Sequence, residues 1–174
     1  MSGHLTGAAG HVHLSDDGLH RYWLRRELEG GLFSRRRTVV WVMLNPSTAD
    51  HAADDPTMRR VIAFSRDMPV DQLEVVNLFS FRTPDPAALW RVPGRDGDPA
   101  NLDTIRSTCK AAALVVVAWG AAADRAPGRV RTVSAMLTSL EPMPPVFCLG
   151  YTQGHQPRHP LFLEAGTKLE RWPS

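Results

Sequence analysis

The sequence predicts an α/β fold: a three-layer α/β/α sandwich with a central, mostly parallel four-stranded sheet, plus an N-terminal β-hairpin. Apolar runs without polar alternation are typical of buried strands, and they cover residues 39–44, 73–82, 114–120 and 146–150. Segments with helical periodicity lie between these runs. Such an alternation of strands and helices is typical of a parallel sheet that is covered on both faces.

Length and composition predict one soluble domain. The chain has 174 residues, of which 43% are hydrophobic and 22% are charged, as in globular proteins with a sizeable core. No run approaches the roughly 18 apolar residues of a membrane span, and the N-terminus lacks the pattern of a secretory signal. Cys109 and Cys148 show no paired spacing, so we expect reduced thiols in a cytoplasmic protein. The net charge of +2 does not by itself establish a nucleic-acid binder.

The N-terminal part predicts a hairpin. Residues 1–10 are small, polar and Gly-rich, so we expect disorder there and a single domain over residues 11–174. Alternating residues at 11–15 and 19–26 flank a turn sequence at 16–18, which is typical of two paired strands. Four histidines fall in this region, at His4, His11, His13 and His20. No Cys or Glu completes a set of metal ligands, so we favour a solvated hairpin face over a metal site.

The first core strand ends in a polar loop that is a candidate site. Pro46 lacks an N–H group and disfavours helix at Asn45, so the strand must end there. The loop that follows carries three carboxylates, at Asp50, Asp54 and Asp55. Ligands of open α/β sheets bind beyond the carboxyl ends of the strands. The alternative interpretation is an ordinary turn, for which Asn, Pro and Ser are common residues.

Helices are predicted over residues 55–66, 101–112 and 130–137, with a short one after residue 83. Asp55 suits the N-cap of the first helix, and Pro56 suits its first helical position. The C-terminal residues 168–172 are a candidate edge strand. No Gly-x-Gly-x-x-Gly motif or P-loop follows any strand, so a dinucleotide or nucleoside triphosphate site would lack its usual phosphate cradle.

Two further polar residues follow the later strands. Asn77 interrupts an apolar run, and a buried Asn needs partners, which are either nearby backbone or a ligand. His155 and His159 stand four residues apart, but Pro157 prevents the helix that a zinc pair would need. His159 is expected at the same sheet edge as Asn45 and Asn77, either facing a ligand or bonded to backbone.

Four motifs, in this order, resemble those of the uracil-DNA glycosylase superfamily. They are Leu44-Asn45-Pro46-Ser47, Val75-Val76-Asn77-Leu78, Val116-Val117-Ala118-Trp119-Gly120 and Arg158-His159-Pro160. From about Ser15 to Trp172, the chain also resembles a little-characterised bacterial family of unknown function. The hallmarks of that family are Leu-Asn-Pro-Ser-Thr-Ala-Asp, Asn-Leu-Phe, Ala-Trp-Gly and Pro-Arg-His-Pro-Leu, and all are present here.

The superfamily resemblance implies hydrolysis of an N-glycosidic bond of a nucleobase, as in DNA repair, with no cofactor and no metal. His159 would donate a hydrogen bond to the carbonyl oxygen of the departing base. Asn77 would read the base edge, and Asn45 would hold the attacking water. Because an amide is not a base, Asp50 or Asp55 would assist that water.

The resemblance also implies a set of substrate-binding residues. A flipped-out base would stack on Phe79 or Phe64. Phosphate groups would contact Arg59, Arg60, Arg82 or Arg158. Ser47 and Trp119 belong to the same motifs, Thr48 follows Ser47, and these three residues complete the predicted binding set.

The sequence departs from uracil glycosylases at two of these motifs. Met43-Leu44 precedes Asn45 in place of a Gly-rich segment, and Leu161-Phe162 follows Pro160, so the usual DNA-penetrating loop is not recognisable. A nucleoside, nucleotide or single-stranded DNA fits the modest charge better than duplex DNA. The alternatives are a non-catalytic module that binds a nucleobase, nucleotide or nucleic acid, and another small-molecule enzyme on the same fold. No membrane partner is expected, and the oligomeric state stays open.

Overall fold

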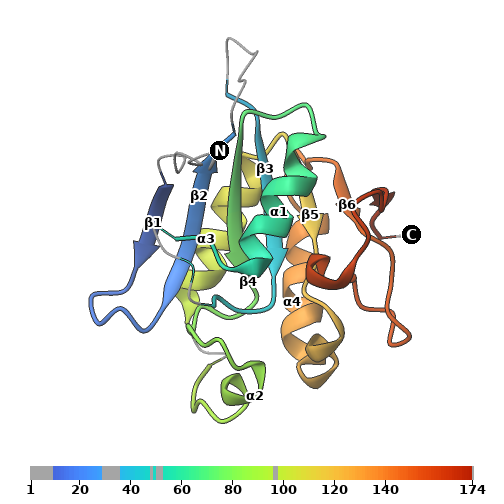
Figure 1. The fold of residues 1–174 in the computed structure, drawn as a ribbon. Coiled ribbons are helices and arrows are strands. Elements are labelled where there is room, and N and C mark those ends of the chain that lie inside the picture. Colours follow the sequence, from blue (N-terminus) through green and yellow to red (C-terminus); the bar gives the residue numbers. More distant parts are fainter. Residues whose placement is uncertain (1–9, 29–35, 48, 50–52, 96–97, 174) are drawn as a thin grey trace, which may run out of the picture.

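A single sheet forms the centre of the computed structural model, which describes residues 10–28, 36–47, 49, 53–95 and 98–173 (Figure 1). Within these residues the sheet has seven strands, in the order β1-β2-β4-β3-β5-β6-β7. The strands are β1 (Gly10–Leu14), β2 (Arg21–Glu27), β3 (Thr38–Met43), β4 (Gln72–Asn77), β5 (Leu114–Val117), β6 (Val146–Cys148) and β7 (Glu170–Arg171).

The sheet is mixed, with parallel strands at its centre. β3 lies between β4 and β5 and runs parallel to both, and β6 runs parallel to β5. β2 pairs antiparallel with β4, β1 with β2, and β7 with β6. The carboxyl ends of β3, β4 and β5 therefore share one edge of the sheet, at which Met43 lies opposite Asn77.

The prediction of a four-stranded sheet with a separate hairpin is wrong. The hairpin strands β1 and β2 belong to the same sheet. On the opposite side of the sheet, β7 pairs with β6 as a further antiparallel outer strand. β2 covers the side of β4, with Leu24 opposite Val75, and both side chains are buried in one core layer. An uncovered β4 would expose a row of unpaired backbone groups. The α/β class holds, but the sheet is mixed.

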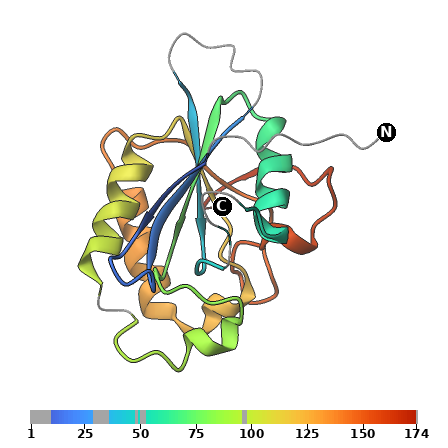
Figure 2. The same cartoon turned by 60° about the vertical axis from the view of Figure 1, so that its left-hand side comes forward.

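Helices cover both faces of the sheet (Figure 2). α1 (Pro56–Arg66) lies on one face, whereas α3 (Pro99–Lys110) and α4 (Pro127–Thr138) lie on the other. The shorter helices are α2 (Pro86–Leu89), η1 (Ala121–Arg125) and η2 (Pro160–Phe162). Within the described residues, no helix has the length and apolar character to cross a membrane.

The starts of the α-helices follow from local sequence. Each of α1 to α4 begins with a proline, whose fixed φ angle suits the first helical position. Aspartates cap three of them, and Asp55 does so for α1 by accepting from the Met58 N–H at 2.8 Å. The predicted cap at Asp55 is therefore confirmed.

The core consists of two apolar layers, one on each face of the sheet. Trp41 packs in the layer under α1, and its indole N–H donates to Ser65 Oγ at 3.0 Å. Val42 packs in the layer under α3 and α4. Side chains alternate along a strand, and Met43 and Val75 lie in the α1 layer. Asn77, two residues after Val75, therefore projects on the α1 face at the carboxyl edge.

Candidate functional site

A cavity of about 630 Å³ lies at the carboxyl ends of β3, β4 and β5, beside the start of α1. Its walls come from the loop after β3, the first turn of α1, the loop after β5 and the segment around η2. Asn45, Asn77 and His159, which were expected at this sheet edge, all line it. The volume lies within the range of about 300–1,000 Å³ that is usual for small-molecule sites.

Asn45 is held in place through its amide nitrogen. Nδ2 donates to the carbonyl oxygens of Pro46 and Thr83, each at 3.1 Å. These two bonds use both amide hydrogens, so Oδ1 is the group through which Asn45 can bind a ligand. Because Oδ1 only accepts, it suits a water molecule or a hydroxyl group that donates to it.

Asn77 is almost fully buried, at 1% exposure, and its Nδ2 has no hydrogen-bond partner among the described residues. Its backbone carbonyl accepts from Asn101 Nδ2 at 3.1 Å, which holds the end of β4 against α3. An unpaired buried amide costs about 1–3 kcal/mol. A ligand with an acceptor at this point would remove that cost, and the free amide therefore favours a polar ligand edge.

His159 is oriented by its own backbone turn. Nδ1 accepts from the N–H of Leu161 at 3.2 Å, capping η2. In a neutral ring the proton must then sit on Nε2, which becomes a donor. Burial lowers the pKa of His159 to about 4, while the negative charge of Asp55 opposes this shift. The imidazole is therefore neutral at neutral pH.

Gly120 sets the distance between the end of β5 and His159. Its φ angle is +78°, and a Cβ atom there would lie 3.0 Å from the Cβ of His159. A side chain at residue 120 would therefore be strained and would push against the histidine. The Trp-Gly pair of the sequence motif thus acts through the glycine, which lets the two loops approach.

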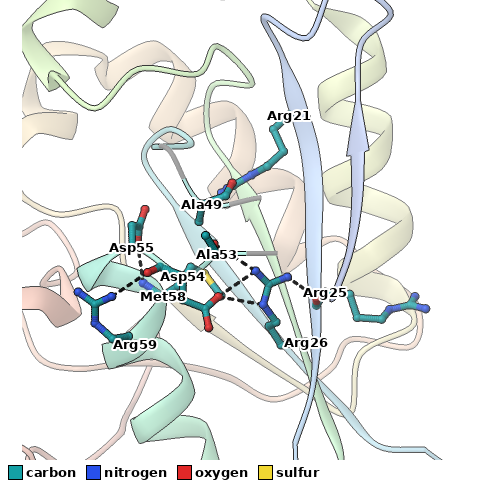
Figure 3. Close-up of polar contacts among 9 residues, drawn as sticks. All are labelled: Arg21, Arg25, Arg26, Ala49, Ala53, Asp54, Asp55, Met58 and Arg59. Atoms are coloured by element: carbon teal, nitrogen blue, oxygen red, sulfur yellow. Dashed lines mark hydrogen bonds and ion pairs between the residues drawn. The ribbon is translucent and has the colours of Figure 1, made fainter. Parts of the chain in front are cut away.

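Asp55 is the carboxylate of the acidic loop that lines the cavity. Oδ1 is used by the α1 cap, whereas Oδ2 has no hydrogen-bond partner in the described part of the chain. Asp54 instead forms an ion pair with Arg26, at 2.8 Å (Figure 3). Asp50, the other predicted catalytic carboxylate, and Thr48 lie outside the described residues.

Arg21 also lines the cavity, although the sequence contains no signal that identifies it. It is the first residue of β2, it is 3% exposed, and its NH1 group donates to the Ala49 carbonyl at 2.7 Å. Burial lowers the pKa of Arg21 to about 10, so the guanidinium stays charged at neutral pH. The alternating pattern of residues 19–26 predicts a strand, but not its position beside the cavity.

Phe79 and Phe64, the two residues proposed to stack on a base, are not among the residues that line the cavity. Phe79 is fully buried in the core layer under α3 and α4, and it packs edge-on against Trp90, with ring centroids 5.9 Å apart. Phe64 packs on Trp41 in the α1 layer. Trp119 lines the cavity, but its indole N–H donates to Gln156 at 2.8 Å and the ring packs against Trp172.

Phe162 is the aromatic side chain that lines the cavity and is open to solvent, at 86% exposure. It lies in η2, three residues after His159. The apolar pair Leu161-Phe162 after the His-Pro turn was visible in the sequence as a departure from the glycosylase motif. That departure is the signal that could have identified Phe162.

The predicted phosphate-binding arginines are dispersed. Arg158 lines the cavity. Arg60 donates to the carbonyls of Pro160 and Leu163, tying η2 to α1. Arg82 donates to the Gly18 carbonyl at 3.1 Å and lines a separate hollow of about 330 Å³. Ser47 lines both the cavity and this hollow.

Two histidines of the N-terminal hairpin, His13 and His20, contact different residues. His20 contacts Ser80 Oγ through Nδ1 at 2.9 Å, and the ring of His13 packs near that of Tyr22. Across the described ranges, no three His, Cys, Asp or Glu side chains gather as a metal site requires. His4 lies outside the described residues.

Comparison with known proteins supports a family but not an activity. The model of a family described as a protein of unknown function, DUF1643, matches residues 21–161. The predicted membership of a family of unknown function is thereby confirmed, whereas the resemblance to the uracil-DNA glycosylase superfamily stays a prediction. No curated protein and no solved structure has significant similarity to the chain.

Proposed function

We propose that this chain, which belongs to the DUF1643 family of proteins of unknown function, hydrolyses the N-glycosidic bond of a nucleobase-containing substrate. The observation that carries the proposal is that one cavity holds a buried amide, Asn77, with no hydrogen-bond partner for Nδ2 among the described residues, and a neutral imidazole, His159, that can donate through Nε2. A nucleobase edge offers acceptors and donors for an amide. A departing base develops negative charge on a carbonyl oxygen, which a fixed donor stabilises.

His159 supports the departure of the base. As the bond between the sugar carbon and the base nitrogen breaks, its electron pair moves onto the base. The Nε2–H group of His159 would donate a hydrogen bond to the carbonyl oxygen on which this charge collects. Burial keeps the ring neutral, so it stabilises this charge as a donor and need not transfer its proton.

Asn45 and Asp55 would serve the attacking water. The water would donate one hydrogen to Asn45 Oδ1, because both amide hydrogens of Asn45 are already used. Its oxygen would attack the anomeric carbon, and its proton would pass to Asp55 Oδ2 and then to the released base. The other oxygen of Asp55 is held by the α1 cap, which restrains the carboxylate.

The ordered motifs that resemble the uracil-DNA glycosylase superfamily support the same chemistry. Their polar residues Asn45, Ser47, Asn77, Arg158 and His159 all line the cavity. A role in DNA repair would follow only if the substrate is a base within DNA, so the substrate panel below includes DNA.

The test is release of free base, measured by chromatography. The full chain is incubated with single- and double-stranded oligonucleotides, including uracil-containing ones, and with panels of nucleosides and nucleotides. We expect release from at least one substrate, with a loss of about 100-fold or more in His159→Ala, since one oxyanion donor is worth about 10²–10³ in rate. Asn45→Ala should also lose release.

His155→Ala is the matched control, because His155 is an exposed histidine near the same loop and does not line the cavity. It should retain the wild-type rate. Absence of free base from every substrate, with folded wild-type protein, would refute hydrolysis. Equal rates in His159→Ala and wild type would refute the assigned role of the histidine.

A further inference from the structure

Arg21 is a buried cation that has no ion-pair partner among the described residues. The described residues contain three ion pairs, Arg25–Glu74, Arg26–Asp54 and Arg36–Glu27, and Arg21 is in none of them. Its side chain makes one hydrogen bond, from NH1 to the Ala49 carbonyl, and its buried Nε has no partner in the described ranges. Burying a charge without a counter-ion is costly. An anion bound in the cavity would remove this cost.

Charges of both signs act on Arg21, and none of them is paired with its guanidinium among the described residues. Asp55 contributes one negative charge nearby, whereas Arg82 and Arg26 contribute two positive charges that act on Arg21. Arg26 is already balanced by Asp54. No carboxylate lies within 4 Å of the Arg21 guanidinium in the described residues, so its charge is available to a ligand.

Helix α1 adds to the preference for an anion. Thr57 and Met58, in its first turn, line the same cavity as Arg21. The N-terminus of a helix carries a partial positive charge, about half an elementary charge, and attracts anions. Asp55 offsets part of this charge by capping Met58, so the guanidinium is the main attraction.

We propose that Arg21 is the subsite for a terminal phosphate, which makes the substrate of this cavity a free nucleotide. This inference rests on the proposed function, which identifies the remainder of the ligand as a nucleobase and its sugar. Asn77 contacts the base, and Arg21 pairs with the phosphate monoester through Nε and the other guanidinium donors that have no partner in the described part of the chain. Guanidinium and phosphate form strong charge-assisted hydrogen bonds.

The depth of Arg21 distinguishes a nucleotide from a nucleic acid. A terminal phosphate has one substituent and can enter a site where the cation is 3% exposed. A phosphate within a strand has a sugar on both sides, and both must leave towards solvent. The substrate is therefore a free nucleotide, of which a nucleoside monophosphate is the simplest, and not a base within a strand.

The test compares binding, and needs no base release. Calorimetric titration of the full chain measures dissociation constants for nucleoside 5′-monophosphates, the matching nucleosides and oligonucleotides of the same base. We expect at least one monophosphate to bind about 10- to 100-fold more tightly than its nucleoside, as expected for charge-assisted hydrogen bonds. Arg21→Gln should abolish this advantage.

Arg25→Gln is the matched control, because Arg25 lies on the same strand but pairs with Glu74 away from the cavity. It should keep the full advantage of the monophosphate. Asp55→Asn should tighten monophosphate binding severalfold, because it removes the negative charge near Arg21 and keeps the cap. This second variant tests the proposal even if Arg21→Gln does not fold.

The outcomes separate this inference from the proposed hydrolysis. Equal affinity for nucleoside and monophosphate, tighter binding of oligonucleotides, or an advantage that survives in Arg21→Gln would each overturn it. An Arg21-dependent preference without base release would support the phosphate subsite and refute hydrolysis. Equal base release from nucleosides and monophosphates would support hydrolysis and overturn the phosphate subsite.

Discussion

Arg21 and Arg26 lie on the same strand, β2, and each is 3% exposed, yet their surroundings differ (Figure 3). Arg26 donates through Nε to Asp54 at 2.9 Å and through NH1 to the Arg25 carbonyl at 3.0 Å. Arg21 has a single side-chain hydrogen bond within the described residues and lines a cavity. These two arginines are therefore equally buried but have different roles. A paired arginine holds the fold together, and an unpaired one beside a cavity is available to a ligand.

The largest expected effect is on stability, at the paired arginine. Arg26→Gln should lower the free energy of unfolding by about 2–3 kcal/mol, because it leaves Asp54 without its cation and loses buried packing. Urea denaturation at unchanged m-value measures this loss. Arg25→Gln removes a guanidinium that is 35% exposed, against 4% for Arg26, so it loses less buried packing and should cost less, about 1 kcal/mol. Equal losses in the two variants would contradict a special role for the Arg26 pair.

A pH effect follows from His159, which shares the cavity with Arg21. The pKa of His159 is about 4 in the folded protein and about 6.5 when unfolded. Between these values the unfolded chain binds more protons, so stability falls as pH decreases from about 6.5 to about 4. We expect a loss of roughly 1–2 kcal/mol, reduced by the partial exposure of the ring.

Urea denaturation at several pH values measures this dependence, and His159→Gln provides the comparison. The variant should lose less stability over the same pH range than the wild type does. Identical pH profiles would mean that His159 does not change its protonation on unfolding. Nuclear magnetic resonance of the imidazole should then also show a titration near the unfolded value.

A smaller effect is expected for Arg21→Gln. Removing a buried charge that forms no ion pair with any described residue should change the free energy of unfolding by less than about 1 kcal/mol, and can raise it. The same urea experiment compares it directly with Arg26→Gln. A loss as large as that of Arg26→Gln would assign Arg21 to the fold and not to the cavity.

The smallest effect on stability is expected for Asp55→Asn. Asn is as good an N-cap as Asp, so the free energy of unfolding should change by only a few tenths of a kcal/mol. The pKa of His159 should fall further, because the negative charge that opposes its shift is removed. Imidazole resonances followed against pH measure this change. A rise in that pKa would contradict the placement of Asp55 near the ring.

Much of the cavity could be predicted because its markers are local. Pro46 ends the first core strand at Asn45, and Pro160 follows His159 in a turn. The neighbouring proline therefore predicts that each of these polar residues lies at the end of a strand or in a turn. Parallel strands end at a common edge, which places Asn45 and Asn77 together once the strands are assigned. Asp55 follows from the same logic, since Asp before Pro is a typical helix start.

The choice of aromatic and cationic residues could not be made in this way. Phe79 is the second residue after the strand that ends at Asn77, but it packs on the opposite face of the sheet. Phe162 lies on a short helix whose exposure depends on how η2 packs against α1. Arg21 and Arg26 stand five residues apart in one alternating segment, and nothing in that segment distinguishes the paired from the unpaired one.

By itself, the sequence determined the order of the core strands and α-helices, the Asp55 cap of α1 and the strand ends and loops at which Asn45, Asn77 and His159 lie, because these depend on neighbouring residues. Only the tertiary structure decided that β2 joins the sheet beside β4, and with it that Arg21 reaches the cavity while Arg26 meets Asp54. Strand pairing and burial depend on contacts between distant segments, and their specificity comes from packing in three dimensions. Whether a buried charged side chain forms an ion pair therefore depends on the tertiary fold.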